Sequence, residues 1–186
     1  ALKDGNLNAG DRVSVDHFEC SLKGRTYTSF GKTTSEQYKG SMIFVDHMSS
    51  YLHVEHQLGF SAVESIRAKQ NFEQFALDSG VVVQKYLADN GAFKAKDFVQ
   101  HIREHEQSIH YCGVNAHHKN GVAERSIRTV SDTARAMILH SAAHWKNGIE
   151  ASVWPMAVDY ACYVYNHLPK SNGVAPSDLF LGSTVP

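Results

Sequence analysis

The chain has 186 residues, of which 42% are hydrophobic and 20% are charged; these are the proportions of a globular protein and exclude a disordered or fibrous one. At this length we expect one domain that can bury a substantial core without disulfide bonds. The formal net charge of -1 excludes a bulk electrostatic attraction to nucleic acid, so any function on DNA must depend on local charge or on neighbouring segments outside this sequence.

Three strands are predicted in the first third of the chain. Valines alternate with polar residues in "RVSVDHF", which predicts a strand with Asp16 near its end. Residues 20–40 are rich in Gly, Ser, Thr and Lys and predict a long hairpin or loop. Two further strands are expected over 42–45 and 51–56, so this part of the chain favours an antiparallel meander.

A helix and a fourth strand are predicted next. Ser61 and Glu64 fit a capping box, in which each side chain satisfies a free backbone amide of the first helical turn, and the helix is expected over 62–77. The β-branched run "VVVQKYLAD" predicts a strand over 81–89 that is buried on both faces. Asp89 falls at the C-terminal end of this strand.

The remaining sequence predicts three helices and one strand. Apolar patterns predict a helix over 94–106, a short strand over 108–112 and a long amphipathic helix over 120–142. A last helix begins near Trp154, where the following proline is tolerated in the first turn. Its expected buried side chains are Met156, Ala157, Tyr160, Ala161 and Val164. The aromatic side chains that we also expect to pack inside are Trp145 and Tyr163.

Three carboxylates stand where side chains from distant parts of the sequence can converge: Asp16 on the first strand, Asp89 at the end of the fourth and Glu124 near the start of the long helix. A parallel pairing of the two strands would bring Asp16 beside Asp89. Clustered carboxylates repel one another and raise their own pKa values, and hard divalent cations such as Mg²⁺ relieve that repulsion. Asp46 has a similar local sequence, "VDHM", and we interpret it as a structural turn residue.

Six short segments occur in one order over residues 11–186: "VDHF", "IFVDHMSSYLHV", "ADNGAF", "KNGVAERSIRT", "VWPMAVDYACYVYNHLP" and "APSDLFLG". Together they resemble the catalytic core of an integrase of the copia-type LTR retrotransposons, within the DDE integrase family. Asp89 and Glu124 are 35 positions apart, which is similar to the spacing of the second and third acidic residues in that family.

The resemblance implies an α/β, ribonuclease-H-like fold with a five-stranded mixed sheet flanked by helices. It also implies a DDE active site in which Asp16, Asp89 and Glu124 are catalytic and hold two Mg²⁺ or Mn²⁺ ions. The implied activity is polynucleotidyl transfer: water trims the 3′ end of element DNA, and the new 3′-hydroxyl then attacks target DNA. A pair of divalent cations suits such an in-line displacement at phosphorus.

The same resemblance implies element-end DNA and target DNA as partners, together with a homo-oligomer. The residues expected to contact DNA phosphates are Asn115, His117, His118, Lys119, Asn120, Arg125 and Arg128. The three cysteines form no CxxC pair, which favours an intracellular setting, with the nucleus as the location at the time of integration. No apolar run could span a bilayer, so we expect no membrane partner.

The expected organisation is an N-terminal extension over 1–10, the integrase core over 11–169 and a tail over 170–186. We expect the chain to be a piece of a longer polypeptide whose zinc-binding HHCC domain and basic C-terminal region lie outside it. Two positions depart from the family pattern: "HFECSLKG" stands where a Gly-Pro turn is usual, and Ala92 stands where a Gly-Glu pair often follows "DNG". Neither departure affects the three proposed metal-binding residues, Asp16, Asp89 and Glu124.

Three alternative interpretations stay open. The segment "HIREH" matches the HxxEH pattern of zinc proteases, with His101 and His105 on one helical face and Glu104 as the base. A ribonuclease-H-type nuclease would share the fold and the carboxylates. A catalytically silent, domesticated core would keep the fold for DNA binding or assembly.

Overall fold

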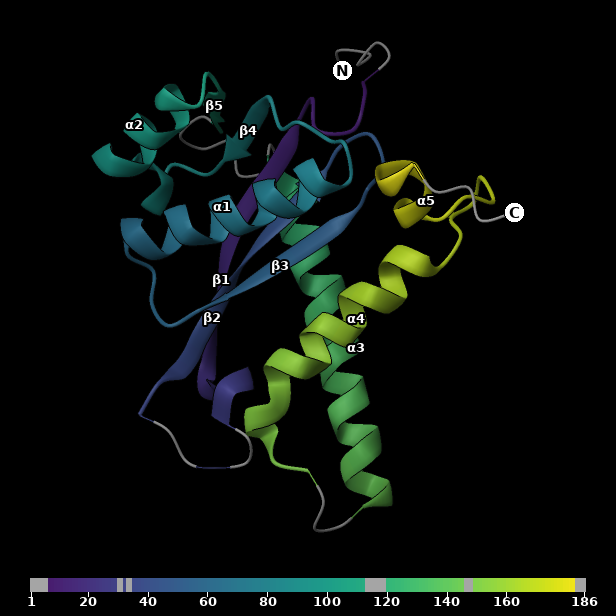
Figure 1. Cartoon of the computed structure of the whole chain (residues 1–186). Helices are drawn as coiled ribbons and strands as arrows, with labels where there is room; N and C mark the ends of the chain where they lie inside the picture. The colour runs from purple at the N-terminus through teal and green to yellow at the C-terminus, as the bar shows by residue number, and fades with distance from the viewer. Residues whose placement is uncertain (1–6, 30–31, 33–34, 113–119, 146–148, 183–186) are drawn as a thin grey trace.

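The computed structural model describes residues 7–29, 32, 35–112, 120–145 and 149–182. Its strands are β1 (Val13–Arg25), β2 (Gln37–Asp46), β3 (Leu52–Gln57), β4 (Lys85–Ala88) and β5 (Ser108–Tyr111). Its α-helices are α1 (Ala62–Asp78), α2 (Lys96–Glu104), α3 (Gly121–His144), α4 (Trp154–His167) and α5 (Pro176–Leu181) (Figure 1). Within the described ranges, none of the helices combines the length and the apolarity needed to cross a membrane.

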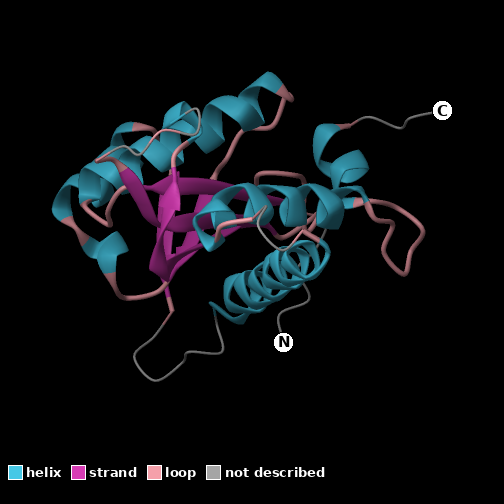
Figure 2. Cartoon of the chain, turned by 90° about the horizontal axis from the view of Figure 1, so that it is seen from below, coloured by secondary structure: helices cyan, strands magenta, loops and turns pink. Residues whose placement is uncertain are grey.

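The strands form one mixed sheet in the order β3-β2-β1-β4-β5. β2 pairs in antiparallel fashion with both β1 and β3, whereas β4 pairs in parallel with both β1 and β5. The predicted meander is therefore confirmed, and the parallel pairing that would bring Asp16 beside Asp89 is present. Helices lie on both sides of this sheet (Figure 2), so the expected five-stranded mixed sheet flanked by helices is confirmed as well.

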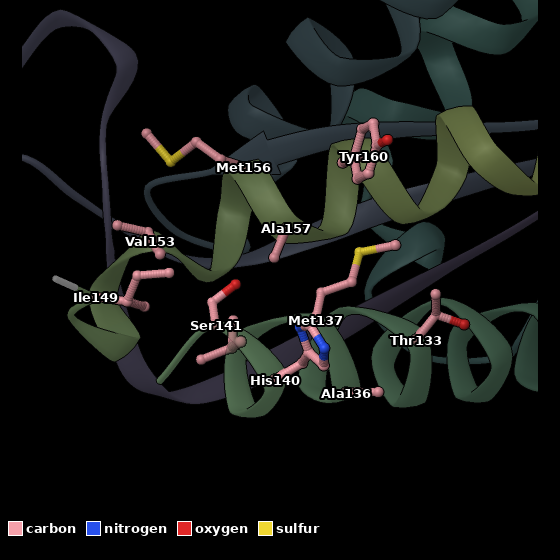
Figure 3. Close-up of a pocket in the computed structure, with 11 residues that line it drawn as sticks. Thr133, Ala136, Met137, His140, Ser141, Ile149, Val153, Met156, Ala157 and Tyr160 are labelled. Atoms are coloured by element: carbon pink, nitrogen blue, oxygen red, sulfur yellow. The ribbon is translucent and has the colours of Figure 1, made fainter. Parts of the chain in front are cut away.

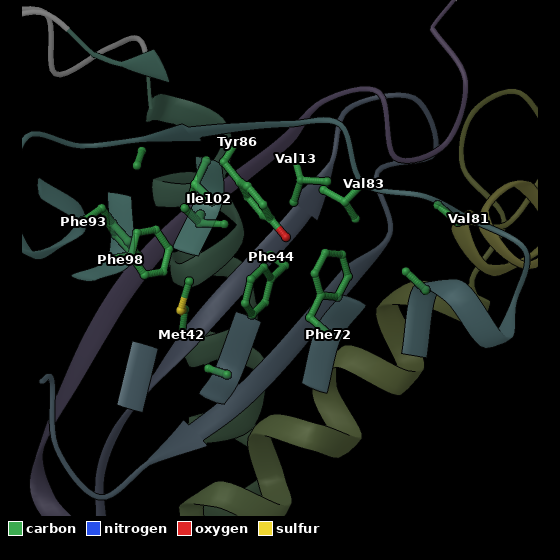
Figure 4. Packing of buried hydrophobic residues seen from close by; sticks show 14 of the residues in the cluster. Val13, Met42, Phe44, Phe72, Val81, Val83, Tyr86, Phe93, Phe98 and Ile102 are labelled. Atoms are coloured by element: carbon green, nitrogen blue, oxygen red, sulfur yellow. The ribbon is translucent and has the colours of Figure 1, made fainter. Parts of the chain in front are cut away.

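Both faces of the sheet are covered because its central strands are apolar on both sides. Phe44 of β2 stacks on Phe72 of α1 with 4.3 Å between ring centroids, in a core that extends to Tyr86 of β4 (Figure 4). Ile43 belongs to a second core, which includes Val130 of α3. Successive residues of a strand point to opposite faces, so the adjacent residues Ile43 and Phe44 supply different cores.

β4 is shorter than predicted, and the segment before it is not buried on both faces. Only Lys85–Ala88 is strand, and Val82 is 56% exposed between the buried Val81 and Val83. Val81 is held by the end of α1, because its N–H donates to the Ala76 carbonyl at 2.8 Å. A run of apolar residues does not reveal which of them pair with a neighbouring strand, and here the first part of the run connects α1 to the sheet.

The start of α1 confirms one half of the predicted capping box. The Glu64 N–H donates to the Ser61 hydroxyl oxygen at 3.3 Å. The Glu64 carboxylate instead accepts from the Leu58 N–H at 3.1 Å and pairs with Arg67 at 3.0 Å. The carboxylate therefore satisfies a backbone amide that precedes the cap, so the second half of the prediction is wrong.

α4 buries part of the predicted face, because Ala161 is buried and Ala157 packs against the core, but its two tyrosines are not buried. Tyr160 and Tyr163 are 58% and 56% exposed, and Trp145 is 62% exposed, so the expectation that these aromatic residues pack inside is wrong. Asn166 is buried instead. Its side-chain oxygen accepts from the Leu52 N–H at 2.9 Å, and its side-chain nitrogen donates to the Leu52 carbonyl at 2.7 Å. Because Asn166 forms hydrogen bonds with the backbone of β3, it faces the interior, and a pattern of apolar residues does not predict a buried polar side chain.

β1 and β2 continue beyond the neighbouring strands as a two-stranded arm, which accounts for the long hairpin or loop predicted from the sequence (Figure 1). The arm packs on the start of α4. The Trp154 indole N–H donates to the Leu22 carbonyl at 2.9 Å, and Arg25 pairs with Glu150 at 2.7 Å. The extension of β1 is therefore held by a segment that comes much later in the chain.

Replacing Gly24 in this arm by alanine is expected to destabilise the fold. A Cβ at Gly24 would lie 2.5 Å from Pro155 Cγ and 2.7 Å from Trp154 Cε2, so rigid rings would have to move, and we expect a loss of about 1–3 kcal/mol in the free energy of unfolding measured in urea. Gly59→Ala is the control, because no atom lies within 4 Å of a Cβ there, and it should cost less than about 0.5 kcal/mol. Equal losses for the two variants would contradict the packing of the arm on α4.

Candidate active site

Asp16 and Asp89 come from neighbouring parallel strands. β1 and β4 pair with Val13 opposite Tyr86 and Ser14 opposite Leu87. The same register continued two residues further puts Asp89, which directly follows β4, beside Asp16. Two carboxylates from distant parts of the sequence thus meet where the strands run side by side.

The turn after β4 is built around the side chain of Asp89. Asp89 Oδ1 accepts from the Gly91 N–H at 3.0 Å, as in an Asx turn. A side chain at position 91 would crowd this carboxylate, because a Cβ would lie 3.0 Å from Asp89 Oδ2. The Asn90 amide donates to the Cys112 carbonyl at 2.5 Å, which ties the turn to the end of β5. These contacts explain why Asn-Gly follows the aspartate.

Asn120 links β1 to the helix that carries Glu124. It directly precedes α3 and is 2% exposed, and its side-chain nitrogen donates to Asp16 Oδ2 at 3.1 Å and to the Val15 carbonyl at 3.3 Å. Glu124 is exposed in the first turn of α3. Residues four apart lie on the same side of a helix, so the contact that holds Asn120 against β1 also turns Glu124 toward Asp16.

The negative charge of Asp16 is disfavoured in the folded chain. Burial is the largest cause that raises its pKa from 3.8 to about 6, and the charges of Asp89 and Glu124 raise it further. Hydrogen bonds from the His17 N–H, at 2.8 Å, and from Asn120 act in the opposite direction. Because water and salt screen distant charges, the effect on Asp16 indicates that both other carboxylates are near.

The three carboxylates form an open cluster and not a closed ligand cage. Among the residues that the structure describes, no group of three or more His, Cys, Asp or Glu side chains is close enough together to hold a metal ion. The donor chemistry nevertheless fits a hard divalent cation, which prefers anionic oxygen ligands and relieves their mutual repulsion. Asp89 and Glu124 are exposed, so their side chains have room to turn toward a cation beside Asp16.

His17 is a neighbour of the site that the sequence analysis missed. Its ring stacks on Phe93 with 4.5 Å between centroids and 2° between planes, and its Nε2 lies 3.1 Å from the Ser65 hydroxyl oxygen. Burial lowers the pKa of His17 to about 4, although the charge of Asp89 opposes that shift. The neutral ring joins β1 to α1 and, through Phe93, to the turn after Asp89. The sequence signal for this position is the alternation of side chains along a strand, which puts His17 on the face of β1 opposite to that of Asp16.

The residues predicted to contact DNA fall into different environments. Four lie outside the described residues: Asn115, His117, His118 and Lys119. Asn120 is buried, with its amide nitrogen bound to Asp16. Arg125 and Arg128 are exposed on the first turns of α3. Contact with DNA stays a prediction for all seven.

Asp46 has the structural role that was predicted for it. It is 1% exposed and accepts from the Gly10 N–H at 2.9 Å, from the Ser49 N–H at 2.7 Å and from the Ser49 hydroxyl at 2.6 Å. The carboxylate therefore joins the turn before β1 to the turn between β2 and β3. The prediction that Asp16, and not Asp46, stands at the candidate site agrees with these contacts.

The "HIREH" segment places His101 and His105 on one side of α2, with 4.1 Å between ring centroids. The His105 ring donates from Nδ1 to the His101 carbonyl at 2.8 Å, and Glu104 accepts from the Gln100 amide at 2.8 Å. Within the described part of the chain no third ligand joins them. The zinc-protease interpretation gains no support from this arrangement.

A cavity between α3 and α4 is separate from the carboxylates. It has a volume of about 560 Å³, and Met137, Met156 and Tyr160 are among the side chains around it (Figure 3). The described residues that line it include no carboxylate. Its first lining residue on α3, Thr133, is nine positions beyond Glu124, or about 13 Å along the helix.

Comparison of the chain with known proteins gives a match in structure and none in sequence. No family model matches the chain, and no curated protein matches its sequence. The HTLV-2 integrase catalytic core domain, in a complex with magnesium in a trimeric form, is similar at a TM-score of 0.67 and 15% identity, over 94% of this chain and 98% of that chain. The catalytic core domain of BIV integrase is similar at a TM-score of 0.62 and 14% identity, over 93% of this chain and 95% of that chain.

A larger assembly gives a third match. A chain of the simian T-cell lymphotropic virus intasome, in complex with the PP2A regulatory subunit B56 gamma, is similar at a TM-score of 0.72 and 14% identity, over 97% of this chain and 58% of that chain. The protein therefore has the fold of integrase catalytic cores, and the expected ribonuclease-H-like fold is confirmed. At these identities the likeness establishes the fold alone.

The carboxyl group of Asp16 is expected to titrate near pH 6, measured from its ¹³C chemical shift. Removing a neighbouring negative charge should lower that midpoint, so Asp89→Asn and Glu124→Gln should each move it down, although it should stay above 3.8 because burial is the main cause. The same raised pKa means that the stability contributed by this group is complete below pH 3.8 and is lost as the pH rises through about 6.

Glu150→Gln provides the control for this titration, because Glu150 pairs with Arg25 in the arm and is not among the charges that act on Asp16. An Asp16 midpoint that does not move in either site variant would show that the three carboxylates are not neighbours in solution.

Proposed function

We propose that this chain is the catalytic core of a retroelement integrase, of the copia type, which trims the 3′ ends of element DNA and joins them to target DNA. The observation that carries the proposal is the convergence of the three acidic positions in a chain with the fold of integrase cores. The parallel register of β1 and β4 leads to Asp16 and Asp89, and Asn120, directly before the helix of Glu124, donates to Asp16 Oδ2 at 3.1 Å. The copia assignment is supported by the six ordered sequence segments and by the spacing of Asp89 and Glu124.

In this proposal Asp16, Asp89 and Glu124 hold two Mg²⁺ or Mn²⁺ ions. Bound there, such cations would activate the attacking oxygen and stabilise the leaving oxygen during displacement at phosphorus. Asn120 keeps Asp16 in one orientation through its hydrogen bond to Oδ2. The Asx turn at Gly91 holds the backbone that carries Asp89.

The similar integrase structures support the proposed cofactors and partners. One integrase core was solved with magnesium in both dimeric and trimeric forms, and another match lies in an intasome. We therefore propose divalent cations, element and target DNA, and a homo-oligomer for this chain, acting in the nucleus at the time of integration. The exposed Arg125 and Arg128 at the start of α3 supply the local positive charge that a chain of net charge -1 needs near DNA.

Glu124→Gln is expected to abolish Mg²⁺-dependent strand transfer on a branched, disintegration-type DNA substrate, with a loss of at least about 100-fold because a charged group that acts at the reacting phosphate is removed. Glu124 is exposed, so the free energy of unfolding should change by less than about 0.5 kcal/mol. Glu104→Gln, the same change at an exposed position on α2, should leave activity unaltered.

The outcome of this assay also separates the alternatives. Full activity in Glu124→Gln would remove Glu124 from the mechanism. Cleavage of an RNA–DNA hybrid without any reaction on branched DNA would favour a ribonuclease-H-type nuclease. A wild-type chain that binds DNA and reacts with neither substrate would favour a silent core.

Mn²⁺ is expected to raise the melting temperature of the wild-type chain, because a ligand that binds only the folded state stabilises it. At about 100 times its dissociation constant the gain is about 2.7 kcal/mol, which corresponds to roughly 5–10 °C for a chain of this length. The double variant Asp16→Asn/Asp89→Asn should show a much smaller rise. Equal rises in the two proteins would argue against a site shared by these carboxylates.

A further inference from the structure

Asp16 and the next residue, His17, point to opposite faces of β1, because side chains alternate along a strand. On one face, Asp16 Oδ2 accepts from the side chain of Asn120, directly before α3, at 3.1 Å. On the other face, His17 Nε2 lies 3.1 Å from the hydroxyl oxygen of Ser65 on α1. A proposed metal ligand and a histidine thus occupy neighbouring positions of one strand, one on each face.

The turn after β4 reaches both of these faces. Ala88, the last residue of β4, belongs to the core under α1, so Asp89 follows on the face of Asp16. Phe93, four residues later, lies in the core under α1 again and is 1% exposed (Figure 4). Its ring stacks on the His17 ring with 4.5 Å between centroids and 2° between planes. The turn therefore contacts β1 from both sides.

Asp89 lies beyond the part of β4 that pairs with β1, since that pairing extends to Leu87. The Tyr111 hydroxyl donates to the Phe93 carbonyl at 2.9 Å, which ties the turn to β5. β5 carries none of the three carboxylates. The stack of Phe93 on His17 instead ties the turn to the strand that carries the other aspartate, so this stack relates the two aspartates to each other.

The orientation of the His17 ring is set by two further contacts. Ser65 is 2% exposed, and its hydroxyl forms the hydrogen bond to Nε2. The ring of Phe60 meets the His17 ring edge-on, with 5.5 Å between centroids and 66° between planes. Rotation of an imidazole about its bond to Cβ is only loosely restricted by itself, so these contacts select the orientation that is parallel to Phe93.

We propose that His17 is a positioning residue for the candidate metal site, because its stack on Phe93 sets where the turn that carries Asp89 lies relative to Asp16. The proposal rests on the proposed function, in which the two aspartates share a divalent cation. His17 acts only through Phe93 and touches neither the cation nor DNA. Asp89 is exposed, so without the stack its carboxylate would occupy many positions. A cation that needs both aspartates would then bind more weakly, because binding would have to order the turn.

Binding of Mn²⁺ to the whole chain tests the proposal, with free Mn²⁺ measured by its electron paramagnetic resonance signal. His17→Ala removes the stack and is expected to raise the dissociation constant about three- to tenfold, the size of effect that one aromatic pair contributes. His17→Phe keeps a flat ring against Phe93 and should bind Mn²⁺ within about twofold of the wild type.

His53→Ala is the matched control. His53 lies on β3 and is partly buried like His17, and its ring centroid is 5.3 Å from that of Phe72 and 5.0 Å from that of Phe75 on α1. The same substitution there also removes a histidine from an aromatic cluster under α1. Because β2 separates β3 from β1, the dissociation constant of Mn²⁺ should change by less than about twofold.

Hydrogen exchange of the turn amides gives a readout without any metal. The Gly91 N–H donates to Asp89 Oδ1 at 3.0 Å, and the Lys94 N–H donates to the Gly91 carbonyl at 3.2 Å. In His17→Ala both amides should exchange about three- to tenfold faster, because the turn opens more often. In His17→Phe and His53→Ala their rates should stay at the wild-type values.

Phe93→Leu removes the other ring of the stack and decides the question if His17→Ala does not fold. It should weaken Mn²⁺ binding and speed exchange of the turn amides to a similar extent. Because both substitutions break one contact, the double variant His17→Ala/Phe93→Leu should bind Mn²⁺ about as well as the weaker single variant, and not with the two effects multiplied.

Three results would overturn the inference. If the wild type binds Mn²⁺ and Asp16→Asn/Asp89→Asn does not, unchanged affinity in His17→Ala and Phe93→Leu would leave the proposed function intact and remove His17 from it. Equal losses of affinity in His17→Ala and His53→Ala would show an effect of general stability. Absence of Mn²⁺ binding by the wild type would overturn both the inference and the proposed function.

Discussion

The candidate site depends on three negatively charged side chains that the fold holds close together although they repel one another. The carboxylate of Asp16 is partly buried within reach of the charges of Asp89 and Glu124, an arrangement that costs free energy until a positive charge joins it. The parallel register of β1 and β4 brings the two aspartates together, and Asn120 holds α3 against β1. The fold therefore supplies the free energy that keeps the cluster assembled, and the net charge of the chain says little about its chemistry.

The parts of the fold that were predicted correctly depend on local signals. Alternating valines mark the strand around Asp16, Ser61 marks the start of α1, and the apolar periodicity before His144 marks α3. The sequence reasoning stated what a parallel pairing of the first and fourth strands would bring together, and the structure contains that pair at the centre of the sheet. The positions of the three carboxylates could thus be anticipated because each follows from its own element.

The parts that were not predicted depend on partners far away in the sequence. The exposed Tyr160 and the buried Asn166 of α4 reflect a pairing with Leu52, 114 positions earlier. The packing of His17 on Phe93 required knowledge of where the turn after β4 would lie. The hydrogen bond from Asn120 to Asp16, 104 positions earlier, was not predicted either. Local patterns carry no information about such long-range pairs.

The central position of β1 has a consequence for how the chain folds. β2, which directly follows β1 in the sequence, pairs with one edge of β1, and β4, which comes after α1, pairs with the other. The arm of β1 packs on Trp154, which is 132 positions after Leu22. Closing long loops adds little to the equilibrium cost but slows folding. During synthesis one edge of β1 stays unpaired until β4, at residues 85–88, has left the ribosome, so the nascent chain passes through an aggregation-prone interval.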